Sequence, residues 1–115
     1  MPKPGDDMIR GTLDMLILKV LSLEPMHGWG IGERIQQLSG HALQVNQGSL
    51  YPALHRLTRE GWIRSEWRRT ENNRRARYYL VTRSGEKRLG IEREQWARLS
   101  HGVARVMETA WEGGR

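Results

Sequence analysis

The sequence predicts a mainly α-helical fold with a small β-hairpin, arranged as a winged helix-turn-helix plus one long C-terminal helix. Three observations support this fold class. Apolar residues recur at helical spacing in three segments before Gly61. The period then changes to two on both sides of a polar turn. A final segment, from Thr82 to about Trp111, returns to helical spacing.

The three helices before Gly61 are predicted from their apolar faces. The first carries Leu13, Leu16, Ile17, Val20 and Leu21, and the stretch EPMHG ends it. The second carries Ile31, Ile35 and Leu38, and the third carries Leu50, Leu54 and Leu57 before it ends at Gly61. Residues 1–8 are expected to form a flexible tail, and residues 9–82 one domain.

A β-hairpin is predicted after Gly61. Ile63, Ser65 and Trp67 alternate with Arg64, Glu66 and Arg68, which is the period of a strand. In the following TENNRR, the Asn72-Asn73 pair suits a turn with positive φ, and ARYYLVT returns as a strand rich in β-forming residues. Three helices followed by a hairpin is the element order of a winged helix-turn-helix.

Residues 83–112 are predicted to form one long helix, which Thr82 or Ser84 caps and Gly113-Gly114 ends. At 1.5 Å per residue it would be roughly 40 Å long, more than the preceding domain can cover. A second copy of the chain is therefore the expected partner, and packing back along its own domain is the alternative. The expected dimer contacts are Leu89, Trp96, Leu99, Val103, Val106, Met107 and Ala110.

The charge pattern indicates a polyanionic partner. Lysine and arginine number 19 against 13 acidic residues, which gives a net charge of +6. Eight arginines and three glutamates lie between Arg56 and Arg77, so one segment carries most of the excess. Such a focused positive field favours nucleic acid or an anionic membrane surface, although a solvated basic face is the alternative.

Composition excludes several other classes. No apolar run approaches the roughly 18 residues of a membrane span, so no membrane partner is expected. The N-terminus lacks the apolar stretch of a signal peptide, and cysteine is absent, which makes the cytoplasm the expected location. The four histidines lack metal-ligand spacing, and GWGIGE lacks the strand and spacing of a phosphate-binding loop. No enzymatic activity, catalytic residue, metal or cofactor is therefore predicted, and His27 is expected to cap a helix or join the core.

The third helix and the hairpin together predict a surface for double-stranded DNA. With Gly48 or Ser49 as the N-cap, Pro52 would be the third or fourth residue, where proline is tolerated and first-turn amides can bind phosphate. Arg56 can pair with guanine or hold the backbone, and Gln47 can pair with adenine. The candidate DNA-binding residues are Gln47, Ser49, Tyr51, Pro52, His55, Arg56 and Arg59 in the helix, and Arg68, Arg69, Arg74, Arg75 and Arg77 in the hairpin.

Three segments resemble the PadR family of bacterial transcriptional regulators: GTLDMLILKVLSLEPMHGWGI, NQGSLYPALHRLTREGWI and RRARYYLVTRSGEKRL. The resemblance covers about residues 9–90, and the total length is similar to that of the short-tailed subfamily with a single C-terminal helix. It implies a homodimeric repressor on a pseudo-palindromic operator. Trp29 stands where the family usually has tyrosine, and Thr58 where an acidic residue is common.

Some short-tailed relatives resemble multidrug sensors in which flat ligands stack on tryptophan between subunits. The resemblance therefore implies a small aromatic effector at Trp96, whereas simple packing of the dimer is the alternative. Trp29, Trp62, Trp67 and Trp111 are expected to be core or interface anchors. Two other functions compete with an operator-binding regulator: a nucleic-acid-binding module without sequence preference, and an adaptor whose winged helix binds protein.

Overall fold

The computed structural model describes residues 6–111 and confirms the predicted fold class. Residues 1–5 of the predicted tail lie outside this range, as does Gly113-Gly114, whereas residues 6–8 are helical and were wrongly assigned to the tail. Along the chain the elements are α1 (Asp6–Leu23), β1 (Met26–His27), α2 (Gly28–Leu38), α3 (Gln47–Arg59), β2 (Ile63–Arg69), β3 (Arg75–Val81) and α4 (Arg83–Glu108).

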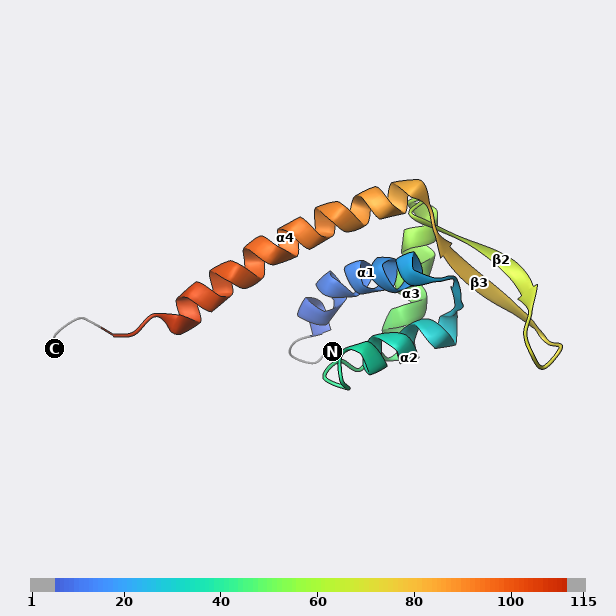
Figure 1. Ribbon diagram of the computed structural model, residues 1–115, viewed down its shortest axis with the longest axis horizontal. Coiled ribbons are helices and arrows are strands. Elements are labelled where there is room, and N and C mark those ends of the chain that lie inside the picture. The colour runs from blue at the N-terminus through green and yellow to red at the C-terminus, as the bar shows by residue number, and fades with distance from the viewer. Residues whose placement is uncertain (1–5, 112–115) are drawn as a thin grey trace.

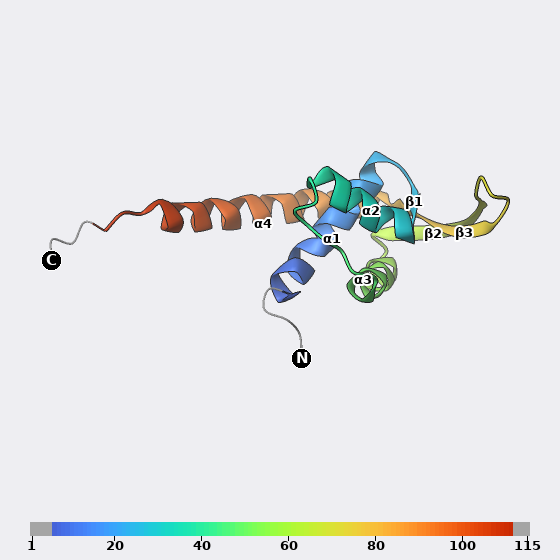
Figure 2. The ribbon, with the colours of Figure 1, turned by 90° about the horizontal axis from the view of Figure 1, so that it is seen from below.

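The three N-terminal helices form a compact group from which the hairpin and α4 extend in opposite directions (Figure 1). Seen from below, α4 and the β2–β3 hairpin lie nearly in line, with α1, α2 and α3 beside their junction (Figure 2). We call the β2–β3 hairpin the wing. The arrangement places a long helix on one side of the domain and a basic wing on the other.

The core is built from the predicted apolar faces. Every described element except β3 contributes at least one apolar side chain that is at most 8% exposed, and β3 contributes the partly buried Tyr79 and Val81. The largest fully buried side chains are Leu13, Ile17, Leu18, Ile31, Leu50, Leu54, Leu57 and Ile63. Burial of one such side chain contributes about 1.5–3 kcal/mol. Leu38 was expected on the buried face of α2, but it is 60% exposed because it is the last residue of the helix.

A short third strand was not predicted from the sequence. Met26 and His27 form β1, which pairs antiparallel with Tyr79 and Tyr78 of β3 and gives the sheet order β1-β3-β2. We expected the stretch EPMHG only to end the first helix. This stretch does end α1, but its residues Met26 and His27 also pair with β3 and so connect the sheet to the helices. His27 then caps α2, as predicted, because its Nδ1 accepts a hydrogen bond from the Gly30 amide at 3.1 Å.

The turn of the wing follows the sequence prediction. Asn73 has a φ of 59°, the left-handed conformation that asparagine tolerates. The Thr70 amide donates to the Arg74 carbonyl at 2.7 Å, which closes the turn. The register beyond it places Trp67 opposite Arg77 and Ile63 opposite Val81. The inner end of the wing therefore joins the core, whereas its outer end projects from the domain.

The junction between α3, the wing and α4 is tightly hydrogen-bonded. Gly61, at a φ of 78°, ends α3, and its carbonyl accepts from the hydroxyls of Thr82 and Ser84 at 2.7 and 2.9 Å. Thr82 caps α4, as predicted, by accepting from the Gly85 amide at 3.0 Å. Helix α4 ends at Glu108, before the predicted Trp111, and Ala110 lies beyond it.

Gly85 allows this junction to close, and we expect Gly85→Ala to destabilise the fold by about 1–3 kcal/mol or more. A Cβ added there would lie only 1.9 Å from the Trp62 carbonyl oxygen, so backbone would have to move. Gly90→Ala is the matched control, since a Cβ added there would point into open space. That change should raise stability by up to about 1 kcal/mol. Urea unfolding at one protein concentration measures both, and equal effects would contradict the assignment.

Candidate functional site

Helix α3 begins earlier than the sequence analysis expected. Asn46 is its N-cap and accepts from the Ser49 amide at 2.8 Å, so neither Gly48 nor Ser49 caps the helix. Pro52 is consequently the sixth residue of α3, in its second turn. Because proline has no N–H, the Gly48 carbonyl lacks its usual donor four residues later. Gly48 and Pro52 are both exposed, so this carbonyl faces the solvent side of the helix.

The other side of α3 is buried, as predicted. Leu50, Leu54 and Leu57 are at most 1% exposed, together with Ala53. Of the candidate DNA-binding residues in α3, Gln47, Tyr51, Pro52, His55 and Arg59 are exposed, whereas Ser49 and Arg56 are half-buried. The structure thus places five of the seven on the open side of the helix.

The Tyr51 side chain of α3 lies against the start of α2. A Cβ added to Gly28 would lie 2.9 Å from the Tyr51 ring, so Gly28 provides the space that the ring occupies. Tyr51, His27 and Trp29 also line a groove of about 310 Å³ whose opposite wall includes Arg77 and Tyr79 of the wing. The groove therefore connects the exposed side of α3 with the face of the wing that points toward it.

Arg56 does not project freely from α3. Its guanidinium donates to the carboxylate of Asp14 in α1, and the two side chains are only 36% and 20% exposed. The helical period alone places Arg56 on the outward side of α3, and nothing in the sequence signals its pairing with Asp14, 42 residues earlier. The pair connects α3 to α1, the first helix of the domain.

The two faces of the wing differ in charge. On its outer face Glu66 accepts from Arg68 at 2.6 Å and from Arg64 at 3.3 Å. The hydrogen bond from Arg68, supported by Arg64, lowers the pKa of the Glu66 carboxyl below its usual value. Glu66 therefore remains ionised and neutralises part of the charge of this face.

The inner face of the wing is defined here as Ser65, Trp67, Arg69, Arg75, Arg77 and Tyr79, which alternate with the outer residues in the observed register. Arg69 donates to the neutral side chain of Asn73 at 2.6 Å. No carboxylate among the described residues pairs with Arg69, Arg75 or Arg77. The inner face is thus the uncompensated positive surface, and it lies beside the groove at Tyr51.

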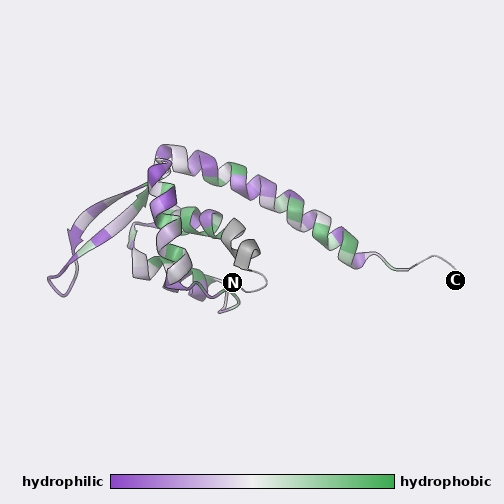
Figure 3. Ribbon diagram, turned by 180° about the vertical axis from the view of Figure 1, so that it is seen from behind, coloured by the Kyte–Doolittle hydropathy of each residue, from purple (hydrophilic) through white to green (hydrophobic). Residues whose placement is uncertain are grey.

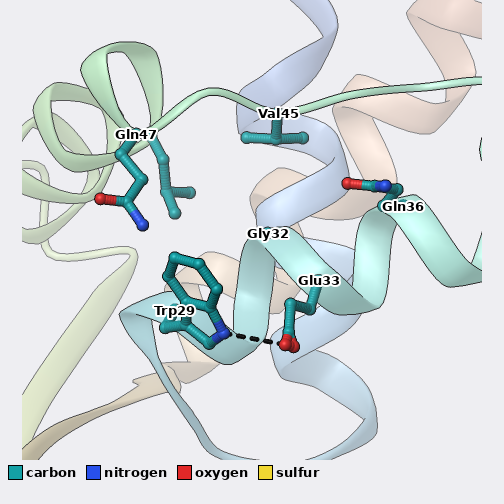
Figure 4. A pocket seen from close by; sticks show the side chains of 7 residues that line it. Trp29, Gly32, Glu33, Gln36, Val45 and Gln47 are labelled. Carbon is teal, nitrogen blue, oxygen red and sulfur yellow. Dashed lines mark hydrogen bonds between the residues drawn. The ribbon is translucent and has the colours of Figure 1, made fainter.

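Trp29 is an exposed residue at the start of α2. It is 56% exposed, and its indole N–H donates to Glu33 at 2.8 Å (Figure 4). The pocket around it also includes Val45 and Gln47, at the entrance to α3. Trp29, Trp67 and Trp111 are all more than half exposed, so none of these three is a core residue, and their alternative role as interface anchors stays a prediction. Trp62 is half-buried against the core, as expected.

The apolar face of α4 is largely uncovered in the single chain (Figure 3). Trp96, Leu99, Val103, Val106 and Met107 are 41–77% exposed. Leu89 differs, since it is 8% exposed and packs in the domain core against residues of α1. It was expected at a dimer contact because it shares the repeat of the later residues. The helix passes α1 at this point and leaves the domain only afterwards.

A hollow of about 410 Å³ lies where α4 leaves α1. Met15, Leu16 and Lys19 of α1 form one wall, and Leu89, Arg93, Trp96 and Ala97 of α4 form the other. The predicted ligand contact Trp96 therefore borders a partly open apolar space.

Comparison with known proteins identifies the family. Residues 17–91 match the sequence model of the Transcriptional regulator PadR-like family. The chain belongs to this family. PadR-like proteins are DNA-binding transcriptional regulators rather than enzymes, as the sequence predicted. Among the described residues no three His, Asp or Glu side chains gather into a metal-binding group. None of the described helices combines the length and the hydropathy of a membrane span.

Solved structures extend the similarity beyond the matched segment. A PadR family transcriptional regulator from Eggerthella lenta is 33% identical, with a TM-score of 0.74 over 90% of this chain and 88% of that one. A transcriptional regulator from Clostridium thermocellum is 29% identical, with a TM-score of 0.78 over 90% of this chain and all of that one. A transcriptional regulator of Mycobacterium tuberculosis is 38% identical over 59% of this chain and 63% of that relative.

Trp29 and Thr58, the two departures from the usual PadR pattern, each form a hydrogen bond within their own helix. Trp29 extends over the groove and pocket at α3, where its indole N–H is paired with Glu33. Thr58 is exposed, and its hydroxyl donates to the Leu54 carbonyl at 2.8 Å within α3. Neither substitution disturbs the core of the PadR fold.

We expect the Asp14–Arg56 pair to couple α1 to α3 by about 1 kcal/mol, measured by urea unfolding of Asp14→Ala, Arg56→Ala and the double variant. Because the Asp14–Arg56 pair is partly buried and hydrogen-bonded, its coupling energy should exceed that of a surface ion pair. The matched control is the Glu24–Arg34 pair, whose side chains are 58% and 41% exposed and whose closest charged atoms are 3.4 Å apart. Its coupling should be below about 0.5 kcal/mol. Similar coupling energies in the two cycles would contradict the prediction.

Proposed function

We propose that this PadR-like protein is a homodimeric repressor that acts in the cytoplasm on a pseudo-palindromic operator and leaves it when a small aromatic ligand binds. The observation that carries the proposal is the acid-free inner face of the wing beside the exposed side of α3. The two surfaces share one groove, which Tyr51 and Arg77 line from opposite sides. A duplex on this side of the domain would meet α3 and the wing together.

The exposed side of α3 suits the major groove of DNA. Gln47, Tyr51, His55 and Arg59 can hydrogen-bond to base edges or phosphates, and Ser49 is half-exposed beside them. Pro52 contributes an apolar surface there. We assign Arg56 to holding α3 in place, because its guanidinium is already engaged by Asp14. Arg69, Arg74, Arg75 and Arg77 would neutralise phosphates, with Arg68 contributing from the partly compensated outer face.

A salt titration with two duplexes tests the proposal. One duplex carries an inverted repeat from the DNA immediately upstream of the gene for this protein, and the other has a random sequence of equal length. The proposed repressor should bind the first at least about 10³ times more tightly at physiological salt. Equal affinity for both duplexes would indicate a nucleic-acid-binding module without sequence preference. Absence of binding at low salt would favour the protein-binding adaptor.

The uncovered face of α4 supports a homodimer. Its 26 residues give α4 a length of about 39 Å, and its apolar side chains beyond Trp96 lack cover from the described part of the chain. An exposed apolar face of this length favours association, and an antiparallel or crossed pair of identical helices would bury it symmetrically. Two domains joined in this way can present two recognition helices to half-sites about one helical turn apart.

We expect Val103→Glu to weaken both the dimer and operator binding, because it places a charge in the buried face of the proposed interface. His101→Glu is the matched control, since it adds the same charge about 160° away around the helix. Sedimentation equilibrium and operator titration measure the two effects. A Val103→Glu protein that stayed dimeric at micromolar concentration would show that α4 pairs through another face.

Ligand-induced release is proposed from the hollow between α1 and α4. Trp96 lies in its wall and is 41% exposed, so an aromatic ligand could stack on the indole while contacting Met15 and Leu16. Each wall also carries one cation, Lys19 in α1 and Arg93 in α4, and these would favour a ligand that is neutral or anionic.

A further inference from the structure

We propose that Trp67 positions Arg75 and Arg77 for the DNA backbone by holding both guanidinium groups against its ring. The inference deepens the proposed function and rests on the wing contacting DNA. The Arg77 guanidinium carbon lies 5.1 Å from the centre of the Trp67 ring, and that of Arg75 lies 5.2 Å from it. Both distances are within the range of a cation–π interaction.

The strand register explains how one indole contacts two arginines. Trp67 in β2 pairs directly with Arg77 in β3, and Arg75 occupies the neighbouring diagonal position on the same face. Two like charges separated by two residues on a strand repel each other and would otherwise spread into solvent. The negative face of the indole attracts both and thus limits their range of orientation.

Contact with an aromatic ring leaves the arginine hydrogen-bond donors available. A guanidinium has five N–H donors in its plane, and attraction to a ring does not occupy them. The outer face of the wing shows the contrasting arrangement, because the donors of Arg64 and Arg68 are directed at Glu66. Trp67 therefore orders two cations without neutralising them, and Glu66 orders two cations by partly neutralising them.

The position of Trp67 argues against a role in the core. The side chain is 54% exposed and lies toward the outer end of β2, beyond Ile63, which fills the core at the inner end. A large aromatic residue on an exposed strand face contributes little burial there. The described structure instead shows two arginines as its close charged neighbours.

Affinity for a random 25-base-pair duplex at low salt tests the inference, with circular dichroism confirming that each variant is folded. Trp67→Leu should lower the affinity about tenfold, since it removes two cation–π contacts while net charge is unchanged. Trp67→Tyr keeps an aromatic face and should stay within about threefold of the original protein. Tyr78→Leu is the control, because Tyr78 contacts Arg68 on the outer face at 5.4 Å. It should change the affinity less than twofold, because Glu66 still holds Arg68 and partly neutralises it when the Tyr78 ring is removed.

A double-mutant comparison separates positioning from direct contact with DNA. In a chain that carries Arg75→Gln and Arg77→Gln, Trp67→Leu should cause no further loss of affinity, because the groups it positions are gone. An undiminished tenfold loss in that background would overturn the inference and indicate direct stacking of the indole on DNA. Equal affinity of Trp67→Leu and the original protein would also overturn it, while leaving the proposed function intact. If the original protein bound no duplex at low salt, both proposals would fail.

Discussion

The junction at the end of α3 sets the geometry of the whole molecule. The Gly61 carbonyl accepts from Thr82 and Ser84, the Thr82 amide donates to the Trp62 carbonyl, and Gly85 packs directly against that carbonyl. Both ends of the wing are thereby tied to the C-terminus of the recognition helix, and α4 begins at the same point. Because the junction consists mainly of backbone groups and short side chains, it allows little rotation. The direction of the wing and that of α4 are consequently both set relative to α3.

The position of the acidic residues decides which arginines of this protein keep their full positive charge. Glu66 lies between two arginines on the outer face of the wing, and Asp14 engages Arg56 on the inner side of α3. The arginines on the inner face of the wing have aromatic or amide neighbours instead of carboxylates. A surface of this kind attracts phosphates over a range of about one Debye length and keeps its donors free. The net charge of the chain alone would not distinguish these two faces.

The sequence predicted those features that depend on local periodicity and missed those that depend on distant contacts. Helical and strand periods located the main elements, and Thr82 was one of the two caps predicted for the last helix, the other being Ser84. The two-residue strand β1 is too short to show a period, so only its pairing with Tyr78 and Tyr79 reveals it. Asn46, Gly48 and Ser49 are all acceptable caps, and the choice between them depends on how the loop packs. The repeat also could not separate Leu89, which the domain buries, from Trp96, which it leaves exposed.

Helix α1 connects the two surfaces that regulation would have to link. Met15 lines the hollow at Trp96, and the preceding residue, Asp14, holds Arg56 of the recognition helix. Consecutive residues of one helix move together, so a ligand that displaced α1 from α4 would also move the anchor of α3. Such a ligand can shift DNA binding only by the difference in its affinity for the two positions of α1. The ion pair would therefore transmit such a displacement, since it links α1 directly to the helix that would contact bases.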